Sequence, residues 1–253
     1  MANTKKFYND LAPLYHLIYS DWEKSIKRQG EMLDSVIREM WEGASDILDV
    51  SCGIGTQTLG LSSLGYNVTA SDLSPGEVDR AKKEATERNL SVTFSVADMR
   101  CSFEHHQRQF DVVISCDNSV PHLLSDEDIF TAFQQFYDSI RPGGGCIISV
   151  RDYEKEDFTK QQVKPYGIRE VDGIRWLIWQ VWDPHPPTYD VTFYFVEDRG
   201  GSECRTNIMR SKYYAVSIPL LMEMMEDASF DDVHRMDDRF FQPIIVGTKR
   251  HNQ

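Results

Sequence analysis

The chain has 253 residues, a length that suits one large domain or one domain with an elaborated insertion. Its hydrophobic (41%), aromatic (11%) and charged (26%) fractions are those of a folded globular protein and exclude a largely disordered chain. With 27 Lys and Arg against 40 Asp and Glu, the net charge is −13, so the summed field repels nucleic acid, which we do not expect as a partner.

Five widely spaced cysteines contain no CxxC pair, which favours neither a disulfide framework nor a structural zinc site. No stretch approaches the roughly 18 apolar residues of a membrane span, and no apolar segment follows Lys5 and Lys6. We therefore expect a cytoplasmic protein that is neither exported nor membrane-embedded and that binds no metal.

The first forty residues have apolar side chains at spacings of three and four, which predicts helices interrupted at Pro13. From Asp46 onward, short apolar segments alternate with amphipathic ones, as in a parallel sheet with crossover helices. Ser74, Pro75 and Glu77 have the pattern of a capping box and predict a helix start there. The expected strands of this part are 47–51, 67–71, 92–96, 110–116 and 146–150.

The last of these strands should follow a helix that opens at Ser125 and is stopped by Arg141-Pro142-Gly143. Beyond Arg151, the aromatic-rich alternating segments 175–182 and 189–196 predict an antiparallel hairpin, to which 205–213 could add a third strand. A helix at 217–228 and strands near Val233 and at 244–248 should close the chain.

The sharpest motif is a predicted strand that runs into Gly53 and Gly55 just before a helix. Two glycines let a ligand approach the backbone where a helix start offers unpaired N–H groups and a positive dipole. Asp72 ends the next strand, where an acidic side chain can bind both ribose hydroxyls of a nucleoside. NAD and S-adenosylmethionine both bind at such a turn, but the third glycine of the NAD fingerprint is replaced by Thr58.

The segment Asp49-Val50-Ser51-Cys52-Gly53-Ile54-Gly55 resembles motif I of the class I S-adenosylmethionine-dependent methyltransferases. Asp72, the turn 97–99, the strand 111–117 and Pro142-Gly143-Gly144 then follow in that family's order. Within the family the chain is most similar to the glycine and glycine/sarcosine N-methyltransferases, through the segments 118–123, 151–153 and 211–214.

The resemblance implies an α/β fold, a Rossmann-like doubly wound, mostly parallel sheet of seven strands. Its parts would be an N-terminal helical cap (1–45), the cofactor-binding core (46–150), an antiparallel β insertion that acts as a lid (151–212) and the completion of the core sheet (213–253).

The resemblance also implies roles for individual residues. Gly53 and Gly55 would approach the methionyl part of the cofactor, Asp72 would bind its ribose and Leu73 would pack near its adenine. Asp98 would accept a hydrogen bond from the adenine amino group, although capping a loop would explain it too. The other residues expected around the cofactor are Tyr15, Trp22, Arg28, Asp49, Met99, Cys116 and His122.

Asn118 and Arg151 follow neighbouring strands at the edge where open α/β sheets bind ligands, and we expect them to hold a substrate carboxylate. A structural ion pair of Arg151 is the alternative. Tyr213 or Tyr214 could supply a hydroxyl near the acceptor. The alternative for Arg28 is a position on a solvated helix face, which its neighbours Lys24 and Lys27 suggest.

The sequence thus predicts an enzyme that uses S-adenosylmethionine to N-methylate an amino acid such as glycine or sarcosine, with S-adenosylhomocysteine as product. A homo-oligomer is left open. The alternatives are a methyltransferase for another small O- or N-acceptor and a non-catalytic nucleoside-binding protein of the same fold. An NAD oxidoreductase is disfavoured by Thr58.

Overall fold

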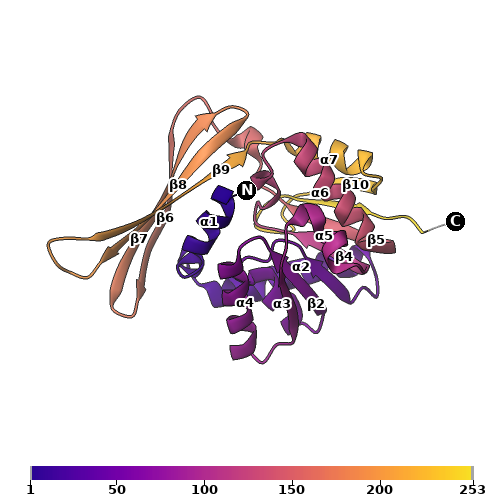
Figure 1. Cartoon of the computed structure of the whole chain (residues 1–253), viewed down its shortest axis with the longest axis horizontal. Helices are drawn as coiled ribbons and strands as arrows, with labels where there is room; N and C mark the ends of the chain where they lie inside the picture. The colour runs from indigo at the N-terminus through magenta and orange to yellow at the C-terminus, as the bar shows by residue number, and fades with distance from the viewer. Residues whose placement is uncertain (1, 252–253) are drawn as a thin grey trace.

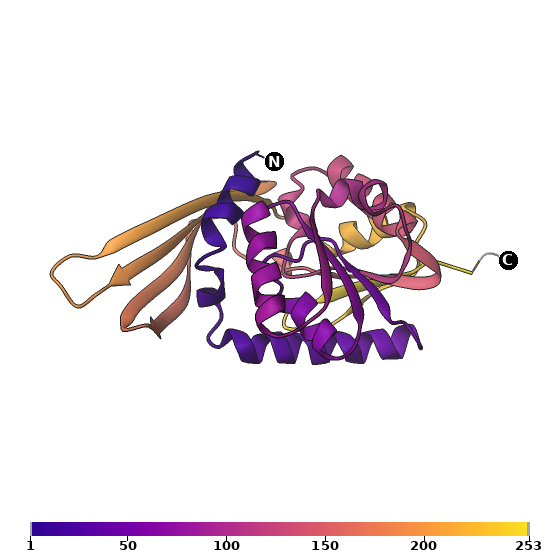
Figure 2. The same cartoon turned by 60° about the horizontal axis from the view of Figure 1, so that its bottom comes forward.

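The computed structural model describes residues 2–251 and contains two separate sheets. Figure 1 shows a seven-stranded sheet with its helices on the right and a four-stranded sheet on the left. The first helix, α1 (Ala2–Leu11), lies between the two sheets (Figures 1 and 2).

The seven-stranded sheet has the order β10-β11-β5-β4-β1-β2-β3. The five strands β1 to β5 run parallel, whereas β11 is antiparallel to both of its neighbours. This is the predicted doubly wound, mostly parallel sheet, and its strand order reverses between β1 and β4, where such sheets bind ligands. The strands are β1 (Asp46–Asp49), β2 (Asn67–Asp72), β3 (Val92–Val96), β4 (Phe110–Ser115), β5 (Ile140–Ser149), β10 (Asp231–Met236) and β11 (Ile244–Thr248).

Helices cover both faces of this sheet, which is why its central strands are apolar on both sides. In β1 the neighbours Ile47 and Leu48 enter different core clusters, and in β4 Val112 and Val113 do the same. α2 and α3 pack on the face that carries Ile47 and Val112, and α6 and α7 pack on the face that carries Leu48 and Val113. Figure 2 shows α2 along the underside of the sheet. The helices are α2 (Trp22–Met40), α3 (Thr56–Ser63), α4 (Pro75–Glu87), α5 (Ser102–His106), α6 (Asp126–Asp138) and α7 (Ile218–Asp227), with short 3₁₀ turns η1 (Tyr15–Ile18), η2 (Met99–Cys101), η3 (Val120–His122) and η4 (Tyr153–Lys155).

Helices α2 and α3 touch through two buried glycines. A Cβ atom on Gly30 would lie 2.7 Å from the Gly60 backbone, and one on Gly60 would lie 2.5 Å from the Ile26 carbonyl oxygen. Glycine disfavours a helix interior by about 1 kcal/mol relative to alanine. Here the close approach of the two backbones explains its presence.

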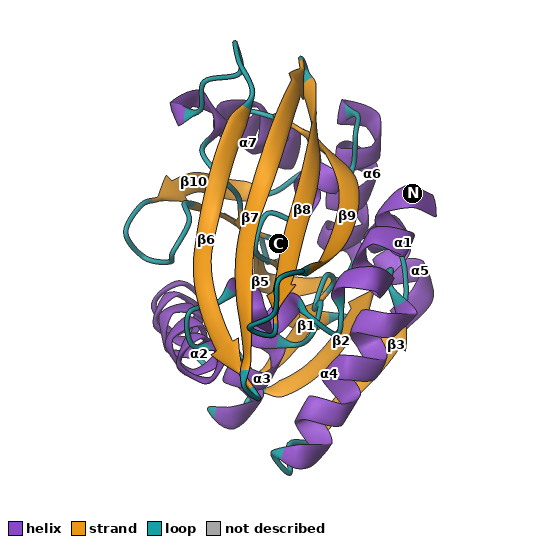
Figure 3. Ribbon diagram, turned by 90° about the vertical axis from the view of Figure 1, so that its left-hand side faces the viewer, coloured by secondary structure: helices purple, strands orange, loops and turns teal. Residues whose placement is uncertain are grey.

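The second sheet, which we call the lid sheet, has the order β6-β7-β8-β9 and is antiparallel throughout. Figure 3 views it face-on. The predicted strands in this region are present, but the sequence did not predict β6. Its alternation is interrupted where Pro165 and Gly167 flank a shift of register, and Val163 and Ile168 are exposed. The strands are β6 (Gln162–Val171), β7 (Ile174–His185), β8 (Thr188–Asp198) and β9 (Arg205–Tyr214).

One prediction in the core was wrong: Arg141-Pro142-Gly143 does not end a helix. α6 already ends at Asp138, and the segment lies within β5, which begins six residues before the predicted strand at 146. The early part of β5 pairs irregularly with β4. Gly145 is needed there because a Cβ atom would lie 1.9 Å from the ring of Trp41.

The five cysteines are all free, with Cys101 and Cys204 exposed and the other three buried. Among the helices of residues 2–251, none is both long and apolar enough to cross a bilayer. The same residues contain no cluster of three or more His, Cys, Asp or Glu side chains placed to hold a metal ion.

Candidate cofactor and acceptor site

A cavity lies where the carboxyl ends of β1, β2 and β4 meet. The loops after these strands and after β3 supply most of its wall, and residues of the N-terminal segment complete it. We call it the cofactor cavity. It brings together predicted residues from four separate loops and the N-terminal segment: Tyr15, Gly53, Asp72, Leu73, Asp98, Met99 and His122.

The glycine turn between β1 and α3 has the geometry that its sequence predicts. Gly53 (φ +51°) and Gly55 (φ +97°) are both left-handed, a conformation that other residues rarely adopt. Asp49 is buried beneath the turn, where it accepts hydrogen bonds from Ser51 N (3.2 Å) and Thr58 Oγ1 (2.7 Å). Burial raises the pKa of Asp49 to about 7. Asp49 therefore shapes the turn from below and does not line the cavity.

Asp72 ends β2 at the cavity wall. Its carboxylate accepts hydrogen bonds from Gly53 N at 3.0 Å and from Ser74 N at 2.8 Å, while desolvation raises its pKa. The predicted capping box of α4 is therefore only half formed. Ser74 Oγ accepts from Glu77 N at 3.2 Å, but the Ser74 N–H that would bind the Glu77 carboxylate is occupied by Asp72.

Asp98 has the capping function that was the alternative considered from the sequence, and its hydrogen bond with an adenine amino group stays a prediction. It lines the cavity, and it also caps η2 by accepting from Arg100 N at 3.0 Å. Its carboxylate pairs with the Arg100 guanidinium at 2.8 Å, and although desolvation opposes ionisation, these bonds lower the pKa of Asp98. The acid is thus held ionised beside Leu73 and Met99.

Tyr8 and Tyr15 line the cavity and Tyr19 borders a neighbouring hollow, and of these three tyrosines the sequence predicted only Tyr15. Tyr8 Oη lies 2.7 Å from His122 Nε2, and Tyr19 Oη donates to Asp117 at 3.1 Å. Burial lowers the pKa of His122 to about 3, so its ring is neutral at neutral pH and can accept a hydrogen bond from the Tyr8 hydroxyl. The common face of Tyr8, Tyr15 and Tyr19 at helical spacings was the available signal.

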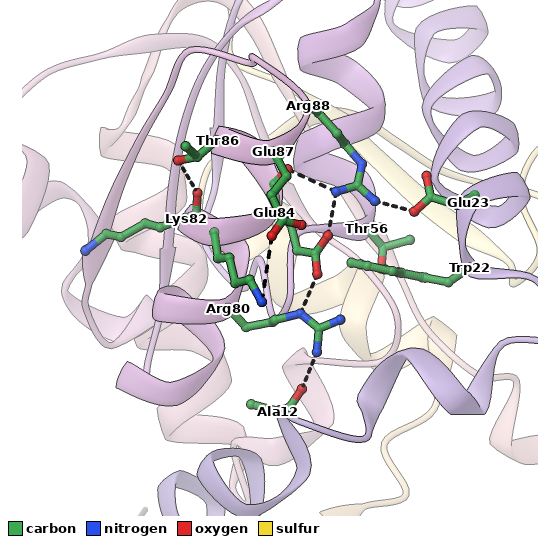
Figure 4. A network of polar contacts seen from close by, with 11 residues as sticks. Ala12, Trp22, Glu23, Thr56, Arg80, Lys82, Glu84, Thr86, Glu87 and Arg88 are labelled. Carbon is green, nitrogen blue, oxygen red and sulfur yellow. Dashed lines mark hydrogen bonds and ion pairs between the residues drawn. The ribbon is translucent and has the colours of Figure 1, made fainter. Parts of the chain in front are cut away.

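A polar network fixes this segment to α4 (Figure 4). Arg80 donates to the Ala12 carbonyl oxygen at 3.5 Å and pairs with Glu84. Arg88 pairs with Glu84 and Glu23. Trp22 packs against both arginines, with their guanidinium carbons 5.5 and 5.4 Å from its ring centroid, and donates to Thr56 Oγ1 at 2.9 Å. The network explains how the start of α2 is anchored.

Five residues predicted near the cofactor do not line the cavity, and one of them, Gly55, is the N-cap residue of α3. Trp22 belongs to the network just described, and Asp49 lies beneath the glycine turn. Arg28 is exposed on α2 and borders a neighbouring hollow with Tyr19. Cys116 is buried in the core, where its carbonyl accepts from Ser119 Oγ. The fold gives these residues positions in the scaffold or on the surface, so their direct contact with a cofactor stays a prediction.

A second hollow adjoins the first, and Tyr8 and Tyr15 border both. We call it the acceptor hollow. It lies under the lid sheet and contains three of the residues predicted to act on the acceptor. Its polar lining is Asp117, Asn118, Arg151, Tyr166, Gln180 and Tyr213.

Arg151 is partly buried, with its guanidinium carbon 4.6 Å from the ring centroid of Trp182. Asn118 fixes the backbone at this position, because its Oδ1 accepts from Arg151 N at 3.0 Å while its Nδ2 donates to Tyr153 Oη at 2.7 Å. The next residue, Asp152, pairs with Arg235. Within residues 2–251 no carboxylate forms an ion pair with Arg151, so its charge is open to a ligand.

Asp117 and Asn118 have an unusual backbone after β4, with φ of +57° and +64°. Ser149 holds this conformation, since its Oγ accepts from Asp117 N at 2.7 Å and its carbonyl accepts from Asn118 N at 3.1 Å. Such strain in consecutive non-glycine residues is characteristic of functional sites. It places both side chains in the hollow.

Tyr213 lines the acceptor hollow and contacts two residues of the cofactor cavity, His122 and Tyr8. Its ring centroid lies 3.9 Å from that of His122, and its hydroxyl is 3.5 Å from Tyr8 Oη. Burial raises the pKa of Tyr213, so the hydroxyl stays protonated and can donate.

Known proteins match this chain in sequence and in structure. Residues 47–144 match the family described as a methyltransferase domain. The glycine/sarcosine N-methyltransferase of Parasynechococcus marenigrum is 30% identical over 135 residues, which are 53% of this chain and 47% of that protein. The chain thus spans about half the length of that relative.

Two solved structures share the fold over nearly the whole chain. DesVI of Streptomyces venezuelae has a TM-score of 0.81 at 20% identity and covers 94% of this chain and 97% of its own. CalS10 of Micromonospora echinaspora, an amino pentose methyltransferase solved with S-adenosylmethionine, has a TM-score of 0.76 at 15% identity, with coverages of 89% and 92%.

The family match, the strand order and the glycine turn with Asp72 identify a class I S-adenosylmethionine-dependent methyltransferase domain in this chain. The cofactor of this domain is S-adenosylmethionine. Both conclusions confirm what the motifs predicted.

Proposed function

We propose that the protein transfers a methyl group from S-adenosylmethionine to the amine of a small molecule that also carries an anionic group, with an amino acid such as glycine or sarcosine as the first candidate. The observation that carries this proposal is Arg151, a cation that lines the acceptor hollow without an ion pair to any carboxylate of the described residues. The match to a glycine/sarcosine N-methyltransferase supports it.

The chemistry of the cofactor cavity fits S-adenosylmethionine. Asp72 retains acceptor capacity for ribose hydroxyls beyond its two backbone bonds, and Gly53 leaves the wall open beside it. When bound, the cofactor supplies an activated methyl group.

The acceptor hollow offers groups of opposite charge to a zwitterion. Arg151 can hold a carboxylate in a bidentate pair, and stacking on Trp182 orients its guanidinium. Asp117 lies in the same hollow and can receive the ammonium group. Desolvation raises the pKa of Asp117, which suits it to take up the proton that the amine must lose before it can attack a methyl group.

The remaining residues align the reactants. Asn118 fixes Arg151 and Tyr153, and Tyr8 and Tyr213 lie at the border between the two spaces. Methyl transfer requires an in-line arrangement of nucleophile, carbon and sulfur in a site that excludes water. The tyrosines and the lid sheet provide this enclosure.

An amino sugar is the second candidate acceptor. The fold match to the amino pentose methyltransferase CalS10 includes most of this chain. The tyrosine hydroxyls of the hollow, from Tyr8, Tyr166 and Tyr213, would suit sugar hydroxyls.

The test is incubation of the purified protein with methyl-labelled S-adenosylmethionine and a panel of acceptors, with products identified by mass spectrometry. The panel contains glycine, sarcosine, dimethylglycine, amino sugars and a metabolite extract. We expect a labelled N-methyl product from an acceptor that carries an anionic group. A label that enters only hydroxyl or carboxyl oxygens, or no product at all, would contradict the proposal.

A further inference from the structure

Glu77, in the first turn of α4, is a buried acid that the fold leaves without a partner. Its exposed fraction is 0%, and neither carboxylate oxygen has a hydrogen bond. The Ser74 N–H is occupied by Asp72, and Arg80 pairs with Glu84. Because an unsatisfied buried polar group destabilises a fold, the position calls for a ligand that supplies the missing partner.

The carboxyl group of Glu77 is directed at the glycine turn. A Cβ atom on Gly53 would lie 3.0 Å from Glu77 Oε2 and 3.5 Å from Tyr15 Cε1. Gly53 and Tyr15 both line the cofactor cavity. Glu77 therefore lies directly behind the part of the wall where glycine leaves room for a ligand.

The surroundings of Glu77 would suit a cation. Desolvation, together with the neighbouring acid Asp72, raises the pKa of Glu77 well above its usual range, so the ligand-free site holds this acid neutral, and a cation beside it would favour the ionised carboxylate. The hydroxyls of Tyr8 and Tyr15 and the thiol of Cys52 lie near enough to Glu77 that its ionised form would raise their pKa values. Aromatic faces and a carboxylate at low dielectric both attract positive charge.

We propose that Glu77 faces the sulfonium of the methyl donor across Gly53 and so makes the site bind S-adenosylmethionine in preference to S-adenosylhomocysteine. The sulfonium is the charge that distinguishes the two, because the product has a neutral thioether. The inference rests on the proposed function, since it requires the cavity to be the cofactor site. Glu77 would also favour product release, because S-adenosylhomocysteine has no positive charge for its carboxylate to attract.

The test is calorimetric titration of the wild-type protein and of Glu77→Gln with each ligand separately. Gln keeps the shape of the side chain but has no charge, so we expect the Kd for S-adenosylmethionine to rise at least 10-fold and that for S-adenosylhomocysteine to change less than 3-fold. Glu87→Gln, on the exposed face of the same helix, is the matched control and should change neither value. An unchanged ratio of the two affinities in Glu77→Gln would overturn the inference, including the case in which both fall equally.

A second variant separates recognition from folding. Glu77→Met removes the unpaired carboxyl group, so the ligand-free protein should melt about 2 to 4 °C higher while it loses its preference for S-adenosylmethionine. A lower Tm would show that Glu77 stabilises the ligand-free fold and would count against the inference. If the wild-type protein binds neither ligand, the proposed function fails as well; if it binds both and the Glu77 variants keep the wild-type ratio, only this inference fails.

Discussion

The replacement of Arg151 by Met tests the acceptor site most sharply. Met keeps the length of the side chain and its packing against Trp182 but removes the guanidinium. Removing one partner of a desolvated charge pair costs about 2 to 5 kcal/mol. Because Arg151 is partly rather than fully buried, we take the lower part of this range, about 3 kcal/mol, which corresponds to a loss of about 150-fold in kcat/KM.

The assay is steady-state methyl transfer to an acceptor that carries an anionic group, together with the Kd for S-adenosylmethionine. Arg151→Met should lower kcat/KM about 150-fold and leave the Kd for the cofactor within 2-fold, because Arg151 lines only the acceptor side. Arg210→Met, on the exposed side of β9, is the matched control and should behave as the wild type. A loss below 3-fold, or an equal loss of cofactor affinity, would refute the assignment of Arg151.

Three further substitutions test separate parts of the account. Asp117→Asn keeps a partner for the Tyr19 hydroxyl but removes the charge, so it should raise the KM for an amine acceptor about 10-fold; an unchanged KM would remove Asp117 from the site. Burial lowers the pKa of His122 from 6.5 to about 3, so between these pH values the unfolded chain binds one proton more than the folded chain at this residue. As the pH falls through this range, the free energy of unfolding of the wild type should therefore decrease by about 1.4 kcal/mol per pH unit. His122→Gln should lack this part of the decrease. Urea denaturation of both proteins at pH 6 and pH 4 measures that difference, and parallel pH dependence would contradict it. Gly60→Ala should lower the free energy of unfolding by about 1 to 3 kcal/mol because the added methyl group meets the Ile26 carbonyl; unchanged stability would show that α2 and α3 can separate freely.

The core sheet was predictable because its signals are local. The strand that ends at Asp49, the two left-handed glycines and the acid that ends β2 lie within one βαβ unit, and the backbone geometry of the turn requires the glycines. The lid strand β6 was missed because it lacks such a local signal. Pro165, Gly167 and exposed side chains interrupt the period of two, and pairing with β7 holds the strand in place.

The site was predictable wherever a loop at the carboxyl edge supplies the residue, as for Asp72, Asn118 and Arg151. It was not predictable where distant segments meet. Tyr8 reaches His122 across 114 positions, and Glu77 loses its capping partner because Asp72 occupies it. The packing of Trp22 against two arginines of α4 was not predictable either, because it depends on how the helices are placed.

The central claim is that the cavity at the ends of β1 and β2 binds S-adenosylmethionine through Asp72. Isothermal titration calorimetry of the wild-type protein and of Asp72→Ala tests it directly. We predict saturable binding of one molecule per chain to the wild type, and a loss of about 1 to 3 kcal/mol in Asp72→Ala because buried hydrogen-bonding groups are left unpaired. The absence of saturable binding of both S-adenosylmethionine and S-adenosylhomocysteine to the wild type, or equal affinity in Asp72→Ala, would contradict it.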